Sequence, residues 1–148
     1  MLEIDKYFLD TMRNDAGLSA LMGADISDDR MYSWDYPSVI EFNESYKAAI
    51  FYKDNQNPRP EMHSYPSQRG NIYYYFSIVS RDKTLTKEIA EYIINLFENC
   101  GIFNTTNWRI GNIVMNGNSE GTNEGTPTNP LHKRNISFLL KEVFKRNS

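Results

Sequence analysis

The sequence predicts an α+β fold, in which one long amphipathic helix and an N-terminal helical arm pack on an antiparallel or mixed β-sheet. Two patterns carry this prediction. Apolar side chains alternate with period two over residues 71–80 and recur with helical period over residues 85–100. The chain has 148 residues, of which 40% are hydrophobic. This length supports one hydrophobic core, so we expect a single domain over residues 1–148.

The helical arm opens the chain. Over residues 2–13 the apolar side chains fall on one face of a helix. These side chains are Ile4, Phe8, Leu9 and Met12. Asp15 is suited to cap a second short helix, which Gly23 would end. Polar and acidic residues follow over positions 25–35.

Strands are expected next. Residues 39–42 and 48–52 are rich in β-branched, aromatic and other apolar side chains, which favours two strands. Residues 54–70 contain three prolines among polar residues. Because proline cannot donate a hydrogen bond to a strand ladder, we expect a long exposed loop over residues 54–70.

The strand over residues 71–80 has two apolar faces at its start. One face consists of Ile72, Tyr74, Phe76 and Ile78. Tyr73 and Tyr75 lie on the other face. Either a neighbouring element or another sheet covers these two tyrosines, or they keep their hydroxyl groups in water.

The long helix over residues 85–100 is the clearest amphipathic segment. Its apolar stripe consists of Leu85, Ile89, Tyr92, Ile93, Leu96, Phe97 and Cys100. Its opposite side carries Lys87, Glu88, Glu91, Asn95 and Glu98. Either Asp82 or Thr84 is expected to cap its start, and Gly101 to end it.

The C-terminal third is expected to hold two strands joined by a long loop. The side chains of residues 108–115 alternate between two faces, as in a strand. Residues 116–130 consist only of Asn, Gly, Ser, Thr, Glu and Pro. The second segment predicts a mobile loop over 116–130. In the last segment, Ile136, Phe138, Leu140 and Phe144 share a face at period two. A helical stripe with Leu139 and Val143 is the alternative, but we favour the strand.

Charge argues against some partners and suggests others. The chain has 16 basic and 19 acidic side chains, for a net charge of -3, so it lacks the basic footprint of a nucleic-acid-binding protein. Residues 1–45 carry a net charge of -7, residues 46–100 of +1 and residues 101–148 of +3. These opposite charges either meet within one domain or attract copies head to tail, which is the geometry of a ring.

The compartment and the chemistry are expected to be simple. One cysteine cannot form an internal disulfide, and neither a signal peptide nor a membrane span is visible, so we expect a protein made in the cytoplasm. His63 and His132 lack companions at metal-ligand spacing, which predicts no metal site. Cys100, the last apolar position of the long helix, is expected to be a core residue rather than a nucleophile.

Carboxylates and glycines provide no active site either. The spacing of Asp25, Asp28 and Asp29 differs from a calcium-binding loop, so a solvated acidic turn is expected. Glu88 and Glu91 are expected to be solvated surface acids. Glycines recur every fourth residue from position 117 to 125, but no helix follows to build a phosphate cradle, and we expect them to serve flexibility. We therefore expect no catalytic, cofactor-binding or metal-binding residues.

Several short segments resemble one protein family. Residues 14–23, read Asn-Asp-Ala-Gly-Leu-Ser-Ala-Leu-Met-Gly, and residues 29–32, read Asp-Arg-Met-Tyr, resemble the D-A-x-L-x-x-L-G…R-I-Y opening of tail terminator proteins, also called tail completion proteins, of long-tailed bacteriophages. Further matches follow in the same order. They are the strand over 48–52, the strand over 74–82 that runs into the long helix, and the final strand near 135–144.

The resemblance implies a non-enzymatic protein that forms a homo-oligomeric ring, usually of six subunits. Such a ring caps the tail tube, stops its polymerisation and joins the tail to the head connector. The tail tube protein and the connector or stopper proteins are thus the implied partners, and the head–tail interface of the virion is the implied location. No cofactor, nucleic-acid or membrane binding is implied.

Two other functions remain open at this stage. A head-completion or connector protein of the same virion would share the composition and would bind the portal instead of the tail tube. A small cytoplasmic ligand-binding or hydrolytic domain would need a pocket with titratable groups. The candidates for such a pocket are Tyr73, Tyr75, His63 and Asp82.

Overall fold

The computed structural model describes eight stretches of the chain, and the α+β prediction is confirmed. The described residues are 2–23, 31–33, 47–54, 70–98, 103–104, 108–121, 124–126 and 128–145. The helices are α1 (Leu2–Arg13), α2 (Ala16–Met22) and α4 (Lys83–Glu98). The strands are β1 (Met31–Ser33), β2 (Ala48–Asp54), β3 (Gly70–Ser80), β4 (Phe103–Asn104), β5 (Trp108–Ile110), β6 (Asn112–Glu120), β7 (Glu124–Thr126) and β8 (Asn129–Lys145).

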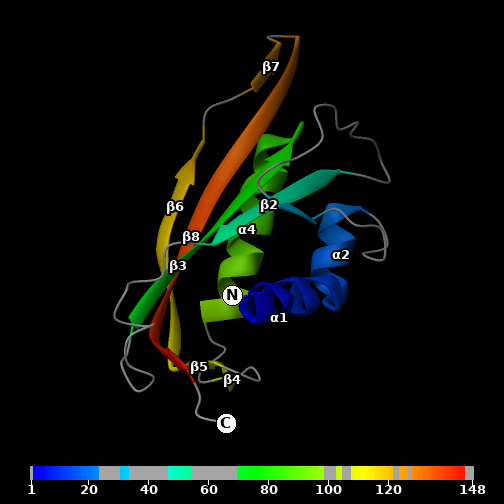
Figure 1. Cartoon of the computed structure of the whole chain (residues 1–148). Coiled ribbons are helices and arrows are strands. Elements are labelled where there is room, and N and C mark those ends of the chain that lie inside the picture. The colour runs from blue at the N-terminus through cyan, green and yellow to red at the C-terminus, as the bar shows by residue number, and fades with distance from the viewer. Residues whose placement is uncertain are drawn as a thin grey trace.

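β8 is the central strand of the sheet and has partners along both of its edges. β3 pairs with one of its edges, and β7, β6 and β5 pair in turn with the other, all antiparallel. β2 pairs antiparallel with β3, whereas β1 pairs parallel with β2. The sheet is therefore mixed. The three helices lie together on one side of it, where α4 contacts β3, β6 and β8 (Figure 1).

The core lies between the helices and the sheet. Aromatic rings from three elements meet in it: the Phe8 ring centroid of α1 lies 4.5 Å from that of Tyr74 in β3 and 4.6 Å from that of Phe97 in α4. The expected faces of the long helix are confirmed, because Ile89, Ile93 and Phe97 are buried. The five residues predicted to face solvent are all exposed.

The start of α4 is fixed by Asp82, not Thr84. The Asp82 carboxylate Oδ1 accepts hydrogen bonds from the backbone N–H groups of Thr84 at 3.0 Å and Leu85 at 3.3 Å. An aspartate cap satisfies amide groups that have no partner within the helix and complements the positive end of the helix dipole. Buried Ser80, just before it, donates to the Lys47 carbonyl at 2.6 Å and so ties the start of β2 to the start of α4.

The helical arm is capped and locked onto α4 as one unit. Asp15 is the N-cap of α2, accepting from the Leu18 N–H at 2.9 Å, and Gly23 ends the helix with a left-handed φ of 91°. The same Asp15 Oδ1 accepts a hydrogen bond from the Tyr92 hydroxyl of α4 at 2.5 Å. Gly17 allows this approach, because a Cβ there would lie 2.2 Å from the Tyr92 oxygen. The Asp-Ala-Gly-Leu segment thus has a packing role.

Loss of the Tyr92 hydroxyl is expected to loosen the arm. Tyr92→Phe should lower the free energy of unfolding by about 1.5–3 kcal/mol, as expected for a hydrogen bond to a charged group. Asp15→Ala should lower it further, because it also removes the helix cap, worth about 1 kcal/mol. If Tyr92 acts through Asp15, the double variant Tyr92→Phe/Asp15→Ala should have the same free energy of unfolding as Asp15→Ala alone in chemical denaturation. Additive losses from the two substitutions would contradict this contact.

The pH dependence of this contact has a defined sign. The hydrogen bond to Asp15 raises the pKa of Tyr92 above its ordinary value of 10.0, with burial and the Asp15 charge acting in the same direction. Because the pKa is higher in the folded state, the stabilisation is complete below pH 10.0 and is lost as the pH rises through the folded-state pKa.

The predicted mobile loop over 116–130 is wrong. β6 continues to Glu120, β7 follows, and β8 begins at Asn129. Polar pairs replace apolar ones in this part of the sheet: Arg134 Nε donates to Asn118 Oδ1 at 2.7 Å, and Asn116 Nδ2 to Ser137 Oγ at 3.4 Å. Strand pairing uses the backbone, and cross-strand polar pairs add to it, so a segment without apolar side chains can extend a sheet whose other strands form the core.

The predicted strand over 108–115 is two strands. A break at Gly111 separates β5 from β6, and the Gly111 N–H donates to the Lys141 carbonyl at 3.1 Å. Because of this break, Ile110 and Ile113 are both buried instead of lying on opposite faces. The predicted strand near the C-terminus is confirmed as β8, although it begins earlier than the apolar pattern does.

Some predictions fall on parts of the chain that the structure does not describe. The strand over 39–42, the helix end at Cys100 and Gly101, and residues 55–69 of the predicted loop lie outside the described residues. The two ends of that predicted loop, Asp54 and Gly70, belong to β2 and β3. Within the acidic segment 25–35, the structure adds the short strand β1.

Candidate functional site

Among the described residues considered for chemistry, none assemble into a metal site. Of the described His, Cys, Asp and Glu residues, no three lie close enough to hold a metal ion. His63, Cys100 and the three aspartates at 25, 28 and 29 lie outside the described residues. Glu88 and Glu91 are exposed on α4, as expected for solvated acids.

Of the four pocket candidates, the structure describes Tyr73, Tyr75 and Asp82, and it separates the two tyrosines from the carboxylate. Asp82 caps α4 just after the last residue of β3, Ser80, which pairs with His132. Tyr73 lies toward the other end of β3, where it pairs with Leu139. His132 lies on β8, and its Nδ1 is buried without a hydrogen-bond partner. These positions leave the tyrosines and the carboxylate too far apart along the strand to line one pocket.

Most of the segment predicted as a mobile loop belongs to a β-arm, here defined as the described residues among 118–134. Beyond the Ser80–His132 pair, β8 no longer pairs with β3. There β8 pairs with β7, and the two strands form a ribbon. The ribbon lies at the end of the sheet opposite the last residues of β8 and extends past the start of α4 (Figure 1). A two-stranded ribbon is only marginally stable by itself.

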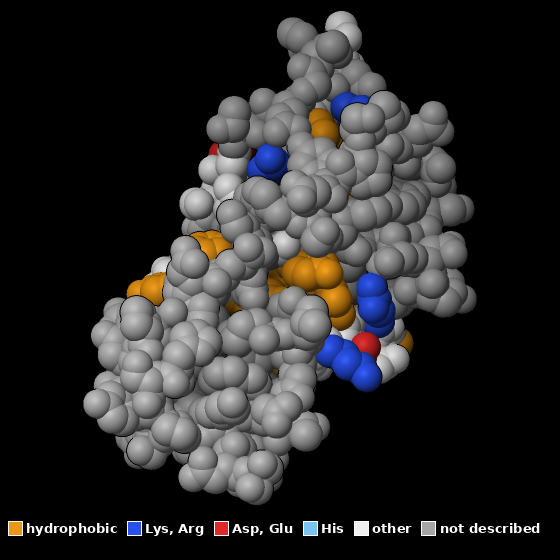
Figure 2. All heavy atoms as spheres, viewed as in Figure 1, with side chains coloured by type: hydrophobic (Ala, Val, Ile, Leu, Met, Phe, Trp, Pro, Cys, Tyr) orange, Lys and Arg blue, Asp and Glu red, His pale blue; other side chains and the backbone are white. Residues whose placement is uncertain are grey.

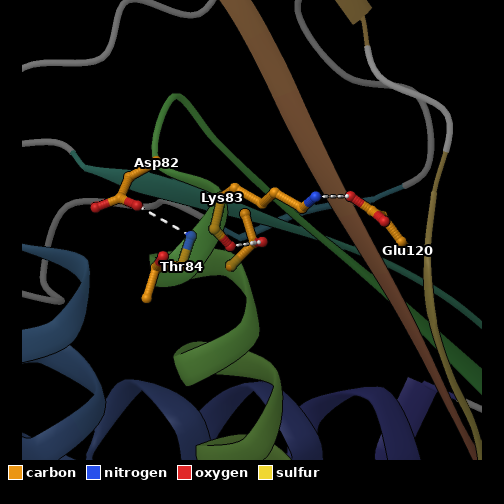
Figure 3. A network of polar contacts seen from close by, with 5 residues as sticks. Asp82, Lys83, Thr84 and Glu120 are labelled. Carbon is orange, nitrogen blue, oxygen red and sulfur yellow. Dashed lines mark hydrogen bonds and ion pairs between the residues drawn. The ribbon is translucent and has the colours of Figure 1, made fainter.

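The base of the β-arm is fixed to α4 by an ion pair. Lys83 Nζ, on the first residue of α4, lies 2.9 Å from Glu120 Oε1 at the end of β6 (Figure 3). Gly121 N–H donates to the Lys133 carbonyl at 2.9 Å, just past the end of β6. Asp82 caps α4 beside this ion pair, so the start of α4 orients both the helix and the β-arm (Figure 3).

The ion pair is expected to be detectable by titration. The hydrogen bond and charge of Lys83 hold the pKa of Glu120 below its ordinary value of 4.5. The interaction is therefore present above pH 4.5 and is lost as the pH falls through the folded-state pKa. Lys83→Met should raise the Glu120 pKa in a carboxyl NMR titration, with little change in melting temperature because both side chains are exposed. An unchanged pKa would contradict the pairing, and Lys87→Met is the matched control.

The described charged side chains form no large uniform patch in the view of Figure 2, where basic and acidic groups reach the surface in small separate clusters. Within the described residues, no helix is long and apolar enough to span a membrane. Sequence reasoning missed both the Tyr92–Asp15 contact and the Lys83–Glu120 pair. Neither has a sequence signal, because each joins residues distant in the chain.

Comparison with known proteins identifies a similar fold but no family. No family model matches the chain, and no curated protein matches it. The fold is similar to that of a chain in the solved structure of the virion of a native gene transfer agent (GTA) particle. The two chains superpose with a TM-score of 0.63 at 9% sequence identity, over 94% of this chain and 92% of the other.

Proposed function

We propose that the chain is a non-enzymatic structural protein of a phage-like virion and that it acts there as a tail terminator. The observation that carries the proposal is the fold shared with a chain of the GTA virion, because the likeness extends over 94% of this chain. A likeness of nearly the whole fold supports an equivalent structural class, although function depends on surfaces that the fold alone does not specify.

Two features of the chain support the terminator role within that class. The resemblance of residues 14–23 and 29–32 to tail terminators is one, and the packing of Asp15 and Gly17 against α4 gives that segment a structural reason. The β-arm provides a surface for a neighbouring protein.

The proposed assembly is a homo-oligomeric ring of six subunits at the head–tail interface of the virion. One side of the ring would bind the last ring of the tail tube protein, and the other the head connector or stopper. A head-completion or connector protein is the competing assignment, since a virion chain of similar fold supports it too.

Removal of the gene from its phage distinguishes these assignments. Electron microscopy of the lysate should show filled heads without tails and tails of uncontrolled length, because tube growth would no longer be stopped. Supply of the intact chain from a plasmid should restore tails of uniform length. Tails of normal length beside unjoined or leaking heads would instead assign the chain to the head connector, and normal infectious particles would contradict a role in the virion.

A further inference from the structure

The sheet face turned away from the helices has an exposed apolar patch at one end. In β3, Tyr73 and Tyr75 alternate with the core residues Tyr74 and Phe76, and their rings stack with centroids 6.5 Å apart. Tyr73 pairs with Leu139 of β8, which pairs in turn with Val114 of β6. We define Tyr73, Tyr75, Val114 and Leu139 as the tyrosine patch. It crosses three neighbouring strands.

The tyrosine patch has the composition of a protein interface. Tyr75 is 40% exposed, and the other three residues of the patch are half-buried. Tyrosine is enriched at interface centres, since its ring buries apolar area while its hydroxyl finds a partner. A tyrosine hydroxyl can donate a hydrogen bond to a carboxylate of a partner.

The charge around the tyrosine patch is basic. Lys141 is exposed on the same face, two residues along β8 from Leu139 and paired with Asn112. Lys133 alternates onto this face as well. No acidic side chain is found among the described residues of β3, β6 and β8 that alternate onto it. The patch therefore presents hydroxyl and ammonium donors and suits a partner rich in carboxylates.

An acidic surface of matching kind is present on α4. Glu88, Glu91, Asn95 and Glu98 follow one another at helical spacings of three and four, and all are exposed. We define these four residues as the α4 stripe. It is about 15 Å long, given a rise of 1.5 Å per residue over ten residues. Carboxylates accept hydrogen bonds and donate none, which complements the donors of the tyrosine patch.

We propose that the tyrosine patch of one copy binds the α4 stripe of a second copy. The two surfaces lie on opposite sides of the sheet, so they cannot meet within one chain. Two different complementary surfaces on each subunit make a heterologous, head-to-tail contact, which generates a closed ring when the rotation permits. The inference rests on the ring that the proposed function requires, and it names the surfaces that would build it.

Single-surface variants test this contact. Tyr75→Glu places a carboxylate opposite the α4 stripe, and Glu91→Arg reverses the charge of the stripe. Each should weaken self-association about tenfold or more in sedimentation velocity, as expected for a central interface residue. Met115→Glu is the matched control. Met115 is 39% exposed, almost as Tyr75 is, but pairs with the core residue Phe138 and so lies on the other face.

Mixing the two variants provides a sharper result. The intact stripe of Tyr75→Glu and the intact patch of Glu91→Arg can bind each other only once, so the mixture should form a discrete heterodimer and stop there. Three results would overturn the inference. One is self-association of either variant at the wild-type level, and another is failure of the mixture to form a heterodimer. The third is a wild-type chain that stays monomeric at every concentration and on tube ends. If the variants associate like the wild type while the wild type still stops tube growth, the interface is wrong and the proposed function stands. If the variants lose self-association as expected but the wild type has no effect on tube growth, the interface stands and only the proposed function is contradicted.

Discussion

Ile93→Ala is expected to lower the free energy of unfolding by about 2–5 kcal/mol. Ile93 lies in the middle of α4, is fully buried and belongs to the main core between helices and sheet. Its truncation leaves a cavity that α4 and the sheet can close only in part. At roughly 2–4 °C per kcal/mol for a chain of this size, the melting temperature should fall by about 4–20 °C.

Glu91→Ala is the matched control, two residues earlier on the exposed side of the same helix. It should change the free energy of unfolding by no more than roughly 0.5 kcal/mol. The two melts are compared at a protein concentration low enough to prevent self-association, because Glu91 belongs to the α4 stripe. Equal destabilisation by the two substitutions would mean that the buried face of α4 has been assigned incorrectly.

Phe8→Ala is expected to have the other large effect, about 3–5 kcal/mol. The Phe8 ring is fully buried, and its centroid lies 4.5 Å from Tyr74, 4.6 Å from Phe97 and 5.6 Å from Phe76. Its removal therefore takes contacts from the sheet and from α4 at once. Aromatic pairs at such distances add about 0.5–1.5 kcal/mol beyond the buried area.

The Phe8 measurement also shows whether α1 is part of the folding unit. Lys6→Ala, at an exposed position of the same helix, should leave urea denaturation nearly unchanged. A single cooperative transition shifted by Phe8→Ala would mean that the helical arm and the sheet unfold together. A Phe8→Ala protein as stable as the wild type would show that the arm is dispensable to the core.

The elements with a buried and an exposed face were predictable from the sequence. α1 and α4 each repeat apolar side chains at the helical period, and burial of one face keeps that repeat readable. β3 was predictable from its run of aromatic and β-branched side chains, although both of its faces carry apolar residues. Asp15 and Gly23 were predictable for a local reason, since helix caps depend on residues within one turn.

The extension of β6 and the start of β8 could not be predicted in the same way. Asn118 and Arg134 pair across the strands through polar groups, so no apolar alternation marks them. Gly117 is part of the same arrangement and not a sign of flexibility, since a Cβ there would lie 2.9 Å from the Ser137 hydroxyl. The parallel pairing of the three-residue strand β1 depends on partners 19 positions further along the chain, which a local pattern does not contain.

The candidate interaction surfaces were predictable only in part. The sequence placed Tyr73 and Tyr75 on the second face of their strand but left open whether that face is covered, and the 40% exposure of Tyr75 favours the solvent-facing alternative. Which strands flank the tyrosines depends on sheet register, and register is set by long-range pairing. Leu139, Val114 and Lys141 could therefore be joined to the tyrosines only with the structure in hand.

The most direct test of the terminator assignment is the length distribution of tail tubes grown from purified tube protein with and without this chain. Added while tubes are growing, the chain should halt elongation at about one ring per tube end, with electron microscopy showing tubes of reduced and more uniform length that carry density at one end. A length distribution that stays unchanged as the chain is raised to excess, with bare tube ends, would contradict the assignment.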